Sequence, residues 1–150
     1  MELTGTRTIA ADRATVWAAL NDPEVLKACI PGCQELTGSA EEGFEATVVQ
    51  KVGPVKATFR GAVTLEDVNA PVSYRIVGEG KGGAAGFAKG DAAVTLAEVP
   101  EGTELSYTVD AKVGGKLAQL GSRIVDGFAK KMADKFFEDF KDQVEGTASA

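Results

Sequence analysis

The sequence contains no histidine. Histidine is the commonest general base, the usual partner of serine and cysteine nucleophiles, and a frequent transition-metal ligand. Its absence excludes the Ser-His and Cys-His classes of enzyme and argues against a transition-metal centre. We therefore expect a protein that binds a molecule without transforming it, with no catalytic residue and no metal ligand.

Long hydrophobic runs are absent as well. No stretch approaches the roughly 18 consecutive apolar residues of a membrane-spanning helix. The first residues, Met1 to Gly5, have neither the basic start nor the apolar segment of a signal peptide. The sequence thus predicts a cytoplasmic location.

Basic residues are in the minority, with 16 Lys and Arg against 22 Asp and Glu, for a formal net charge of −6. An acidic surface repels phosphate backbones and anionic lipid head groups. We expect no nucleic-acid partner and, at most, indirect contact with a membrane.

Cysteine occurs only at Cys29 and Cys33, with Ile30-Pro31-Gly32 between them. Redox and metal sites favour two intervening residues, and a zinc site would need two further ligands that this chain lacks. Both thiols are therefore expected to be structural.

What is present is typical of one globular domain over residues 1–150, with 44% hydrophobic and 25% charged residues. Residues 3–10 are rich in threonine and alternate in polarity, which predicts a first strand. Asp12 is a suitable N-cap for a helix that ends near Leu20, and Asp22-Pro23 begins a second short helix.

Between residues 34 and 113 the apolar period is two, with turn signals and no helix between successive strands. The clearest strand is 55–66. From residue 115 to about 144 the period becomes helical. The sequence therefore predicts an α+β fold, in which a curved antiparallel sheet wraps around one long C-terminal helix, with two short helices after the first strand.

The inner face of this sheet carries unusually small residues: Ala46, Ala57, Gly61, Gly78, Gly80, Ala88, Gly90 and Ala92. Close approach of the long helix, helped by Gly121 and Gly127, would explain them, as would glycine bulges that curl the sheet. A cavity filled by an apolar ligand is the other explanation. Both stay open at the level of the sequence.

Residues 78–83 match the G-x-G-x-x-G pattern of dinucleotide-binding proteins. That pattern requires a helix directly after it, and here a strand follows. We interpret residues 78–86 as a mobile hairpin end and a possible lid over a cavity.

An apolar ligand would contact large and small residues on the inner face of the sheet and on the long helix. Arg7 and Gln50, which also point inward by alternation, are candidate polar anchors. Trp17 is better explained as part of the core than as part of a site. The predicted ligand-binding set is Trp17, Phe44, Ala57, Phe59, Gly61, Tyr74, Ile76, Phe87, Ala92, Leu120, Ile124, Phe128 and Met132.

Three strings carry a family resemblance: Asp22-Pro-Glu-Val-Leu-Lys-Ala-Cys-Ile-Pro-Gly-Cys33, Val52-Gly-Pro-Val-Lys-Ala-Thr-Phe-Arg-Gly61 and Gly114-Gly-Lys-Leu-Ala-Gln-Leu-Gly-Ser-Arg123. With the Phe136-Phe137 pair, they resemble the CoxG family of carbon monoxide dehydrogenase subunits, nearly end to end and in the same order.

The resemblance implies the helix-grip fold of the START-like (SRPBCC) superfamily. It also implies a non-catalytic accessory protein beside a molybdenum hydroxylase of the carbon monoxide dehydrogenase type. The ligand would be a hydrophobic small molecule, such as a lipid or a quinone, and no other cofactor is expected. A peripheral position at the inner face of the membrane is compatible with this role.

Two other functions stay open. The helix-grip fold also hosts cyclase- and hydrolase-like enzymes, so the fold alone does not decide. An assembly or membrane-recruitment factor that holds no ligand is the second alternative.

Overall fold

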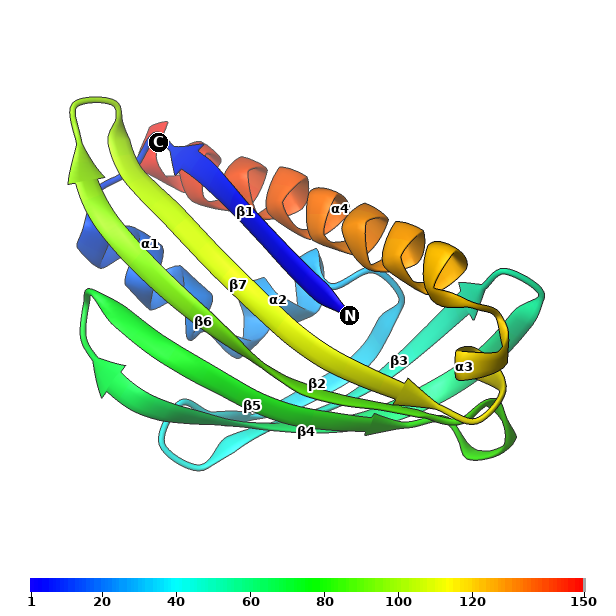
Figure 1. Ribbon diagram of the computed structural model, residues 1–150. Helices are drawn as coiled ribbons and strands as arrows, with labels where there is room; N and C mark the ends of the chain where they lie inside the picture. The colour runs from blue at the N-terminus through cyan, green and yellow to red at the C-terminus, as the bar shows by residue number, and fades with distance from the viewer. Residues whose placement is uncertain (150) are drawn as a thin grey trace.

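Seven antiparallel strands form one curved sheet, and the long helix α4 lies against its concave face (Figure 1). The computed structural model describes the backbone of residues 1–149 and the side chains of residues 1–146. The elements are β1 (Glu2–Ile9), α1 (Arg13–Leu20), α2 (Pro23–Cys29), β2 (Cys33–Ser39), β3 (Gly43–Val52), β4 (Val55–Asn69), β5 (Ser73–Lys81), the short 3-10 helix η1 (Gly83–Ala85), β6 (Phe87–Val99), β7 (Gly102–Gly114), α3 (Lys116–Gln119) and α4 (Ser122–Ser149).

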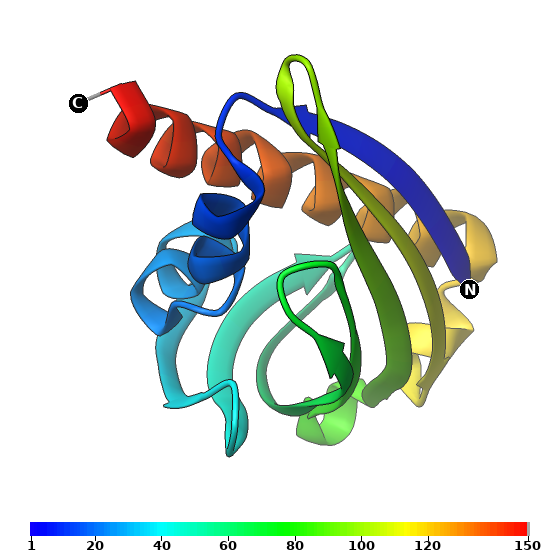
Figure 2. The same cartoon turned by 90° about the vertical axis from the view of Figure 1, so that its left-hand side faces the viewer.

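The strand order is β1-β7-β6-β5-β4-β3-β2. Strands β2 to β7 therefore form a meander in which each strand pairs with the next, and β1 pairs with the last of them. The short helices α1 and α2 carry the chain from one edge of the sheet to the other, and they lie beside α4 at one end of the molecule (Figure 2). The predicted fold class and helix-grip architecture are confirmed.

Both short helices begin where the sequence predicts. A carboxylate oxygen of Asp12 accepts a hydrogen bond from the backbone N–H of Thr15 at 2.8 Å, and Asp22 accepts one from Glu24 at 2.9 Å. Pro23 occupies the first turn of α2, where a backbone N–H would have no hydrogen-bond partner within the helix, so the missing N–H of proline costs nothing.

The long C-terminal helix is interrupted, which the sequence analysis did not predict. The backbone turns between α3 and α4 at Leu120 and Gly121, and Gly121 has a φ of +89°. This left-handed conformation suits glycine and stops the helix. The interruption places Leu117 on α3, outside the stripe that α4 presents to the sheet.

The centre of the core lies between helix α1, the second half of α4 and parts of three strands: the end of β1, the second half of β6 and the first half of β7. Its most deeply buried side chains are Ile9, Val16, Cys29, Leu105 and Phe140, each 0% exposed. Burial of such side chains contributes about 1.5–3 kcal/mol each to folding. Their burial therefore stabilises this end of the molecule.

The small residues of the inner face have more than one cause. A β-carbon at Gly90 would lie 2.2 Å from the carbonyl oxygen of Asp110, so the neighbouring strand requires a glycine there. A β-carbon at Gly61 would meet only ordinary contacts, the nearest at 3.5 Å. At Gly121 and Gly127 it would meet nothing within 4 Å, so close approach of the helix at these glycines is not the explanation. Part of the inner face is thus left unfilled.

A candidate ligand-binding cavity

An apolar cavity of about 290 Å³ lies between the sheet, α2 and the second half of α4. Helix α2 borders it on one side through Leu26, and Ile30, the residue that caps the end of this helix, lines it as well. Fifteen residues line it: Leu20, Leu26, Ile30, Leu36, Phe44, Ala46, Gly61, Val63, Leu65, Tyr74, Ile76, Val94, Leu105, Phe136 and Phe137.

Tyr74 is the one residue of this wall whose side chain carries a polar atom. It is 5% exposed, and burial raises the pKa of its hydroxyl well above the ordinary value, so the group stays protonated. The edge of its ring meets Trp17, with 5.1 Å between the ring centroids. Within the part of the chain that the structure describes, the hydroxyl of Tyr74 forms no hydrogen bond.

The structure brings four residues of the predicted set together in this wall: Phe44, Gly61, Tyr74 and Ile76. Ala92 lies beside Ile76 on the next strand, but it does not line the cavity. Trp17 packs against the core next to Tyr74.

Three other predicted residues line a separate groove of about 780 Å³ along the first half of α4. Its apolar floor consists of Ile124, Phe128 and Met132, and Pro31 and Gln50 form the opposite wall. Its rim is rich in lysine: Lys51, Lys130, Lys131 and Lys135. The groove and the cavity are neighbours along α4, because Met132 of the groove precedes Phe136 of the cavity by one helical turn. They are also neighbours after α2, where Pro31 of the groove directly follows Ile30 of the cavity.

The remaining predicted residues lie elsewhere. Ala57 pairs with Gln50 on β3 and does not line the cavity. Phe59 does not line it either; its ring lies so close to Gly82 that a β-carbon added there would touch it. Leu120 lies against the turn at Gly53. Phe87 is 40% exposed and lies on the outer face, since it alternates with the inward-facing residues of β6.

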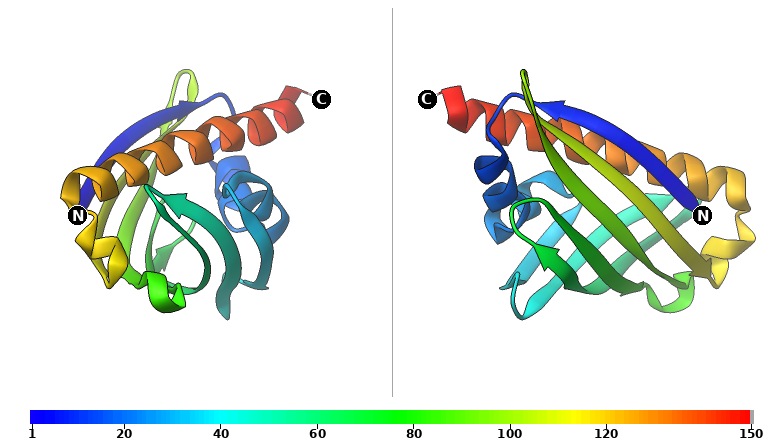
Figure 3. Two further views of the ribbon diagram at one scale, coloured as in Figure 1. Left: turned by 90° about the vertical axis from the view of Figure 1, so that its right-hand side faces the viewer. Right: turned by 60° about the vertical axis from the view of Figure 1, so that its left-hand side comes forward.

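The structure places the segment proposed as a lid, residues 78–86, away from this cavity. Residues 78–81 belong to β5, and Ala85 of η1 is buried against the neighbouring elements. None of residues 78–86 lines the cavity. The hairpin end lies next to α3, away from α1 and α2 (Figure 3, left).

The two candidate polar anchors are engaged by the protein itself. Nη2 of Arg7 donates to Oδ1 of Asp134 on α4 at 2.6 Å and to the hydroxyl of Tyr107 at 3.3 Å. The guanidinium also lies over the ring of Phe137, 5.2 Å from its centroid. Gln50 donates to the carbonyl oxygen of Pro31 at the wall of the groove.

Sequence reasoning missed much of the cavity wall, including Leu26, Ile30, Leu36 and the Phe136-Phe137 pair. The four-residue spacing of Leu26 and Ile30 was a usable signal for an inward helix face. Nothing in the sequence showed that this face would cover the sheet rather than the start of α4.

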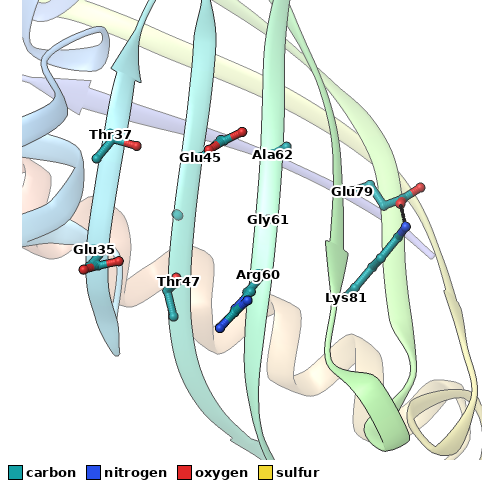
Figure 4. Close-up of a pocket in the computed structure, with 10 residues that line it drawn as sticks. Glu35, Thr37, Glu45, Thr47, Arg60, Gly61, Ala62, Glu79 and Lys81 are labelled. Carbon is teal, nitrogen blue, oxygen red and sulfur yellow. Dashed lines mark ion pairs between the residues drawn. The ribbon is translucent and has the colours of Figure 1, made fainter.

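The outer face of the sheet has a different character. A shallow hollow of about 420 Å³ is lined there by charged and hydroxyl side chains, including Arg60 and the ion pair of Lys81 with Glu79 at 3.2 Å (Figure 4). Its carboxylates and cations point into solvent, so it is a wet strand surface and not a site for an apolar molecule.

Comparison with known families identifies the chain. A model of the CoxG family of carbon monoxide dehydrogenase subunits matches residues 5–145. The chain belongs to this family. No curated protein matches it.

Solved structures support the fold. This CoxG-family chain is similar to a conserved protein from Geobacillus kaustophilus, at 28% identity over 98% of this chain and 97% of the other, with a TM-score of 0.90. It is also similar to a protein from Thermus thermophilus, at 17% identity over 98% and 99% of the two chains, with a TM-score of 0.72. The latter likeness concerns the fold alone.

Other kinds of site find little support in this CoxG-family chain. Within the described residues, no three Cys, Asp or Glu side chains gather in a way that could hold a metal ion. Across the same residues, no helix is both long and apolar enough to cross a membrane.

The two thiols differ in environment. Cys29 is 0% exposed, and burial, followed by the negative charge of Asp139, raises the pKa of its thiol from 9.0 to about 11. Cys33 is partly exposed, and its thiol lies 3.3 Å from the carbonyl oxygen of Glu35. Burial raises its pKa as well.

The buried thiol predicts a loss of stability at alkaline pH. Because the pKa of Cys29 is higher in the folded state, its stabilising effect is complete below the unfolded pKa and is lost as pH rises from about 9 to about 11. We expect the free energy of unfolding, measured by denaturant titration, to fall more steeply over this range in the parent than in Cys29→Ala. Equal slopes for the two proteins would contradict the assignment.

Proposed function

We propose that this protein is a non-catalytic accessory protein that holds a lipid- or quinone-like molecule and works with a molybdenum hydroxylase of the carbon monoxide dehydrogenase type. The observation that carries the proposal is the apolar cavity of about 290 Å³. Protein interiors are packed to crystal-like density, so a void of this size in a natural chain is best explained by an occupant.

The size and chemistry of the wall limit what fits. An engineered apolar cavity of about 150 Å³ is enough to bind benzene. The present cavity therefore suits a ring system or the folded end of a chain, while a long tail would have to leave it. The groove on α4 is one route, since it follows the cavity directly along the helix. A hollow of about 700 Å³ beside Trp17 is the other, since it shares Leu65 with the cavity wall.

Catalysis within the cavity has no support in its residues. The wall contains no carboxylate, no amine and no thiol, and burial raises the pKa of its one hydroxyl, on Tyr74, so that this group stays protonated and is poorly suited to act as a nucleophile or a general base. A cyclase- or hydrolase-like function is therefore disfavoured.

Assembly or recruitment without a ligand is the second candidate, and the groove favours it. Ile124 is 43% exposed there, beside lysines in a chain whose net charge is negative. Among the described residues, Lys51, Lys130 and Lys131 have no ion-pair partner. An exposed apolar surface with a basic rim suits an acidic partner surface in the cytoplasm or at the inner face of the membrane.

Native mass spectrometry of the protein purified from its own host separates the two candidates. We expect a mass excess that disappears on denaturation and an apolar molecule in the solvent extract. Gly61→Leu, which fills the cavity from β4, should lose the adduct and keep the hydroxylase that co-purifies with it. An empty parent chain that still co-purifies with the hydroxylase would contradict ligand binding and support the assembly function.

A further inference from the structure

The cavity wall presents very few groups that make a directional contact, such as a hydrogen bond, with a ligand. Fourteen of its fifteen lining residues present only hydrocarbon side chains, or none, and the backbone groups of the strands are engaged in the sheet. Any directional contact from a side chain must therefore come from Tyr74.

Tyr74 has an unused donor at the end of a largely buried side chain. It is 5% exposed, and its hydroxyl has no hydrogen-bond partner among the residues that the structure describes. The hydroxyl is not among the fully buried side-chain polar atoms that lack a partner, so it keeps some accessible surface and a donor that is free for an incoming group. The group also stays protonated at any ordinary pH, because burial raises its pKa. It is thus a permanent neutral donor.

Tyr107 shows that this is not a general property of the tyrosines here. It is 7% exposed, so it is buried to a similar degree, but its hydroxyl is engaged by Nη2 of Arg7 at 3.3 Å. The chain has two tyrosines, and the one without a partner is the one that lines the cavity.

Charge excludes a further set of ligands. The wall contains no ionised side chain, so a carboxylate or an ammonium group that entered would lose its hydration without gaining a counter-charge. A fatty-acid anion or a cationic amine is therefore unsuited to this cavity.

We propose that the ligand is uncharged and presents a hydrogen-bond acceptor, a carbonyl or ether oxygen on an apolar skeleton, to the hydroxyl of Tyr74. This inference rests on the proposed function, because it names the chemistry that the proposed ligand must have. The Tyr74 hydroxyl is then the group that distinguishes the ligand from a plain hydrocarbon of the same shape.

Two unreactive probes of one shape test the inference: tetralin, a pure hydrocarbon, and tetralone, the same bicycle with one carbonyl. We expect tetralone to bind about 3- to 10-fold more tightly to the parent, which is the ordinary range for one hydrogen bond. The ionised naphthoate should not bind. Affinities are measured by calorimetry or by NMR titration.

The matched variants are Tyr74→Phe and Tyr107→Phe. Tyr74→Phe should bind both probes with equal affinity, and the empty protein should be about as thermally stable as the parent, because no hydrogen bond to a described residue is lost. Tyr107→Phe should keep the preference for tetralone. The infrared carbonyl band of tetralone bound to the parent should shift to lower wavenumber, a readout that does not depend on any variant.

The outcomes are distinguishable. Equal binding of both probes by the parent, or a preference that survives in Tyr74→Phe, overturns the inference and leaves the ligand-binding function standing. Tight binding of naphthoate overturns the assignment of an uncharged ligand. Failure of both neutral probes to bind the parent overturns the ligand-binding function itself.

Discussion

Gly61→Leu is expected to weaken the binding of tetralin by at least about tenfold while leaving the protein folded. Gly61 lines the cavity, and a β-carbon there meets no atom closer than 3.5 Å, so the new side chain projects into the void. It occupies the volume that the probe needs. Stability should hold or rise by up to about 1 kcal/mol, because glycine within a strand is unfavourable.

The same substitution at Gly90 is the control. Gly90 is also on the inner face, but its β-carbon would lie 2.2 Å from the carbonyl oxygen of Asp110 and 2.7 Å from the Cα of Ala111. Gly90→Leu should therefore cost about 1–3 kcal/mol or more, as overpacking does. Ala46→Leu, which enters the cavity from the strand beside Gly61, should reproduce the loss of binding. If Gly61→Leu destabilises the protein as much as Gly90→Leu does, the cavity is a solid core and the ligand hypothesis fails.

Phe140→Ala is expected to have the largest effect on stability, about 3–5 kcal/mol in the free energy of unfolding. Phe140 is 0% exposed and is the largest fully buried side chain among the described residues. Its ring stacks on that of Phe136, with 5.8 Å between the ring centroids, and packs edge to face with Phe137, with 6.5 Å between the centroids. Truncation therefore leaves a cavity among aromatic neighbours. Denaturant titration monitored by circular dichroism measures the loss.

Phe128→Ala on the same helix provides the comparison. Phe128 lies on the same apolar stripe in the sequence, but it is only half-buried at the floor of the groove. Its truncation should cost about 1 kcal/mol or less, because its surroundings already include solvent. Comparable losses for the two variants would show that the groove is closed in solution and that α4 is packed along its whole length.

The sequence was informative wherever structure depends on neighbours along the chain. Asp12 and Asp22 cap their helices because a cap needs only the next few residues. The alternation within 55–65 placed its residues on the correct face because a strand has a period of two. The family strings around Gly32 and Gly121 fall at turns with left-handed backbone, where glycine is favoured.

The site could be predicted only in part, because a cavity depends on distances across the fold. Phe136 and Met132 follow one another on a single stripe, yet Phe136 lines the apolar cavity and Met132 lines the more open groove. The position of α2 over the second half of α4 makes this difference, and no local pattern records it. The same holds for Arg7, whose inward direction was visible, but whose partner Asp134 lies 127 residues away.

The sequence by itself therefore determined the fold class, the starts of both short helices, the family and the absence of histidine chemistry. The tertiary structure decided which inward-facing residues stand beside empty space and which touch a neighbour. Gly61 and Gly90 look alike in the sequence, but the curvature of the sheet brings backbone against one and a void against the other. It also singled out Tyr74 from Tyr107, because a hydroxyl is free or engaged according to what the fold places within about 3 Å of it.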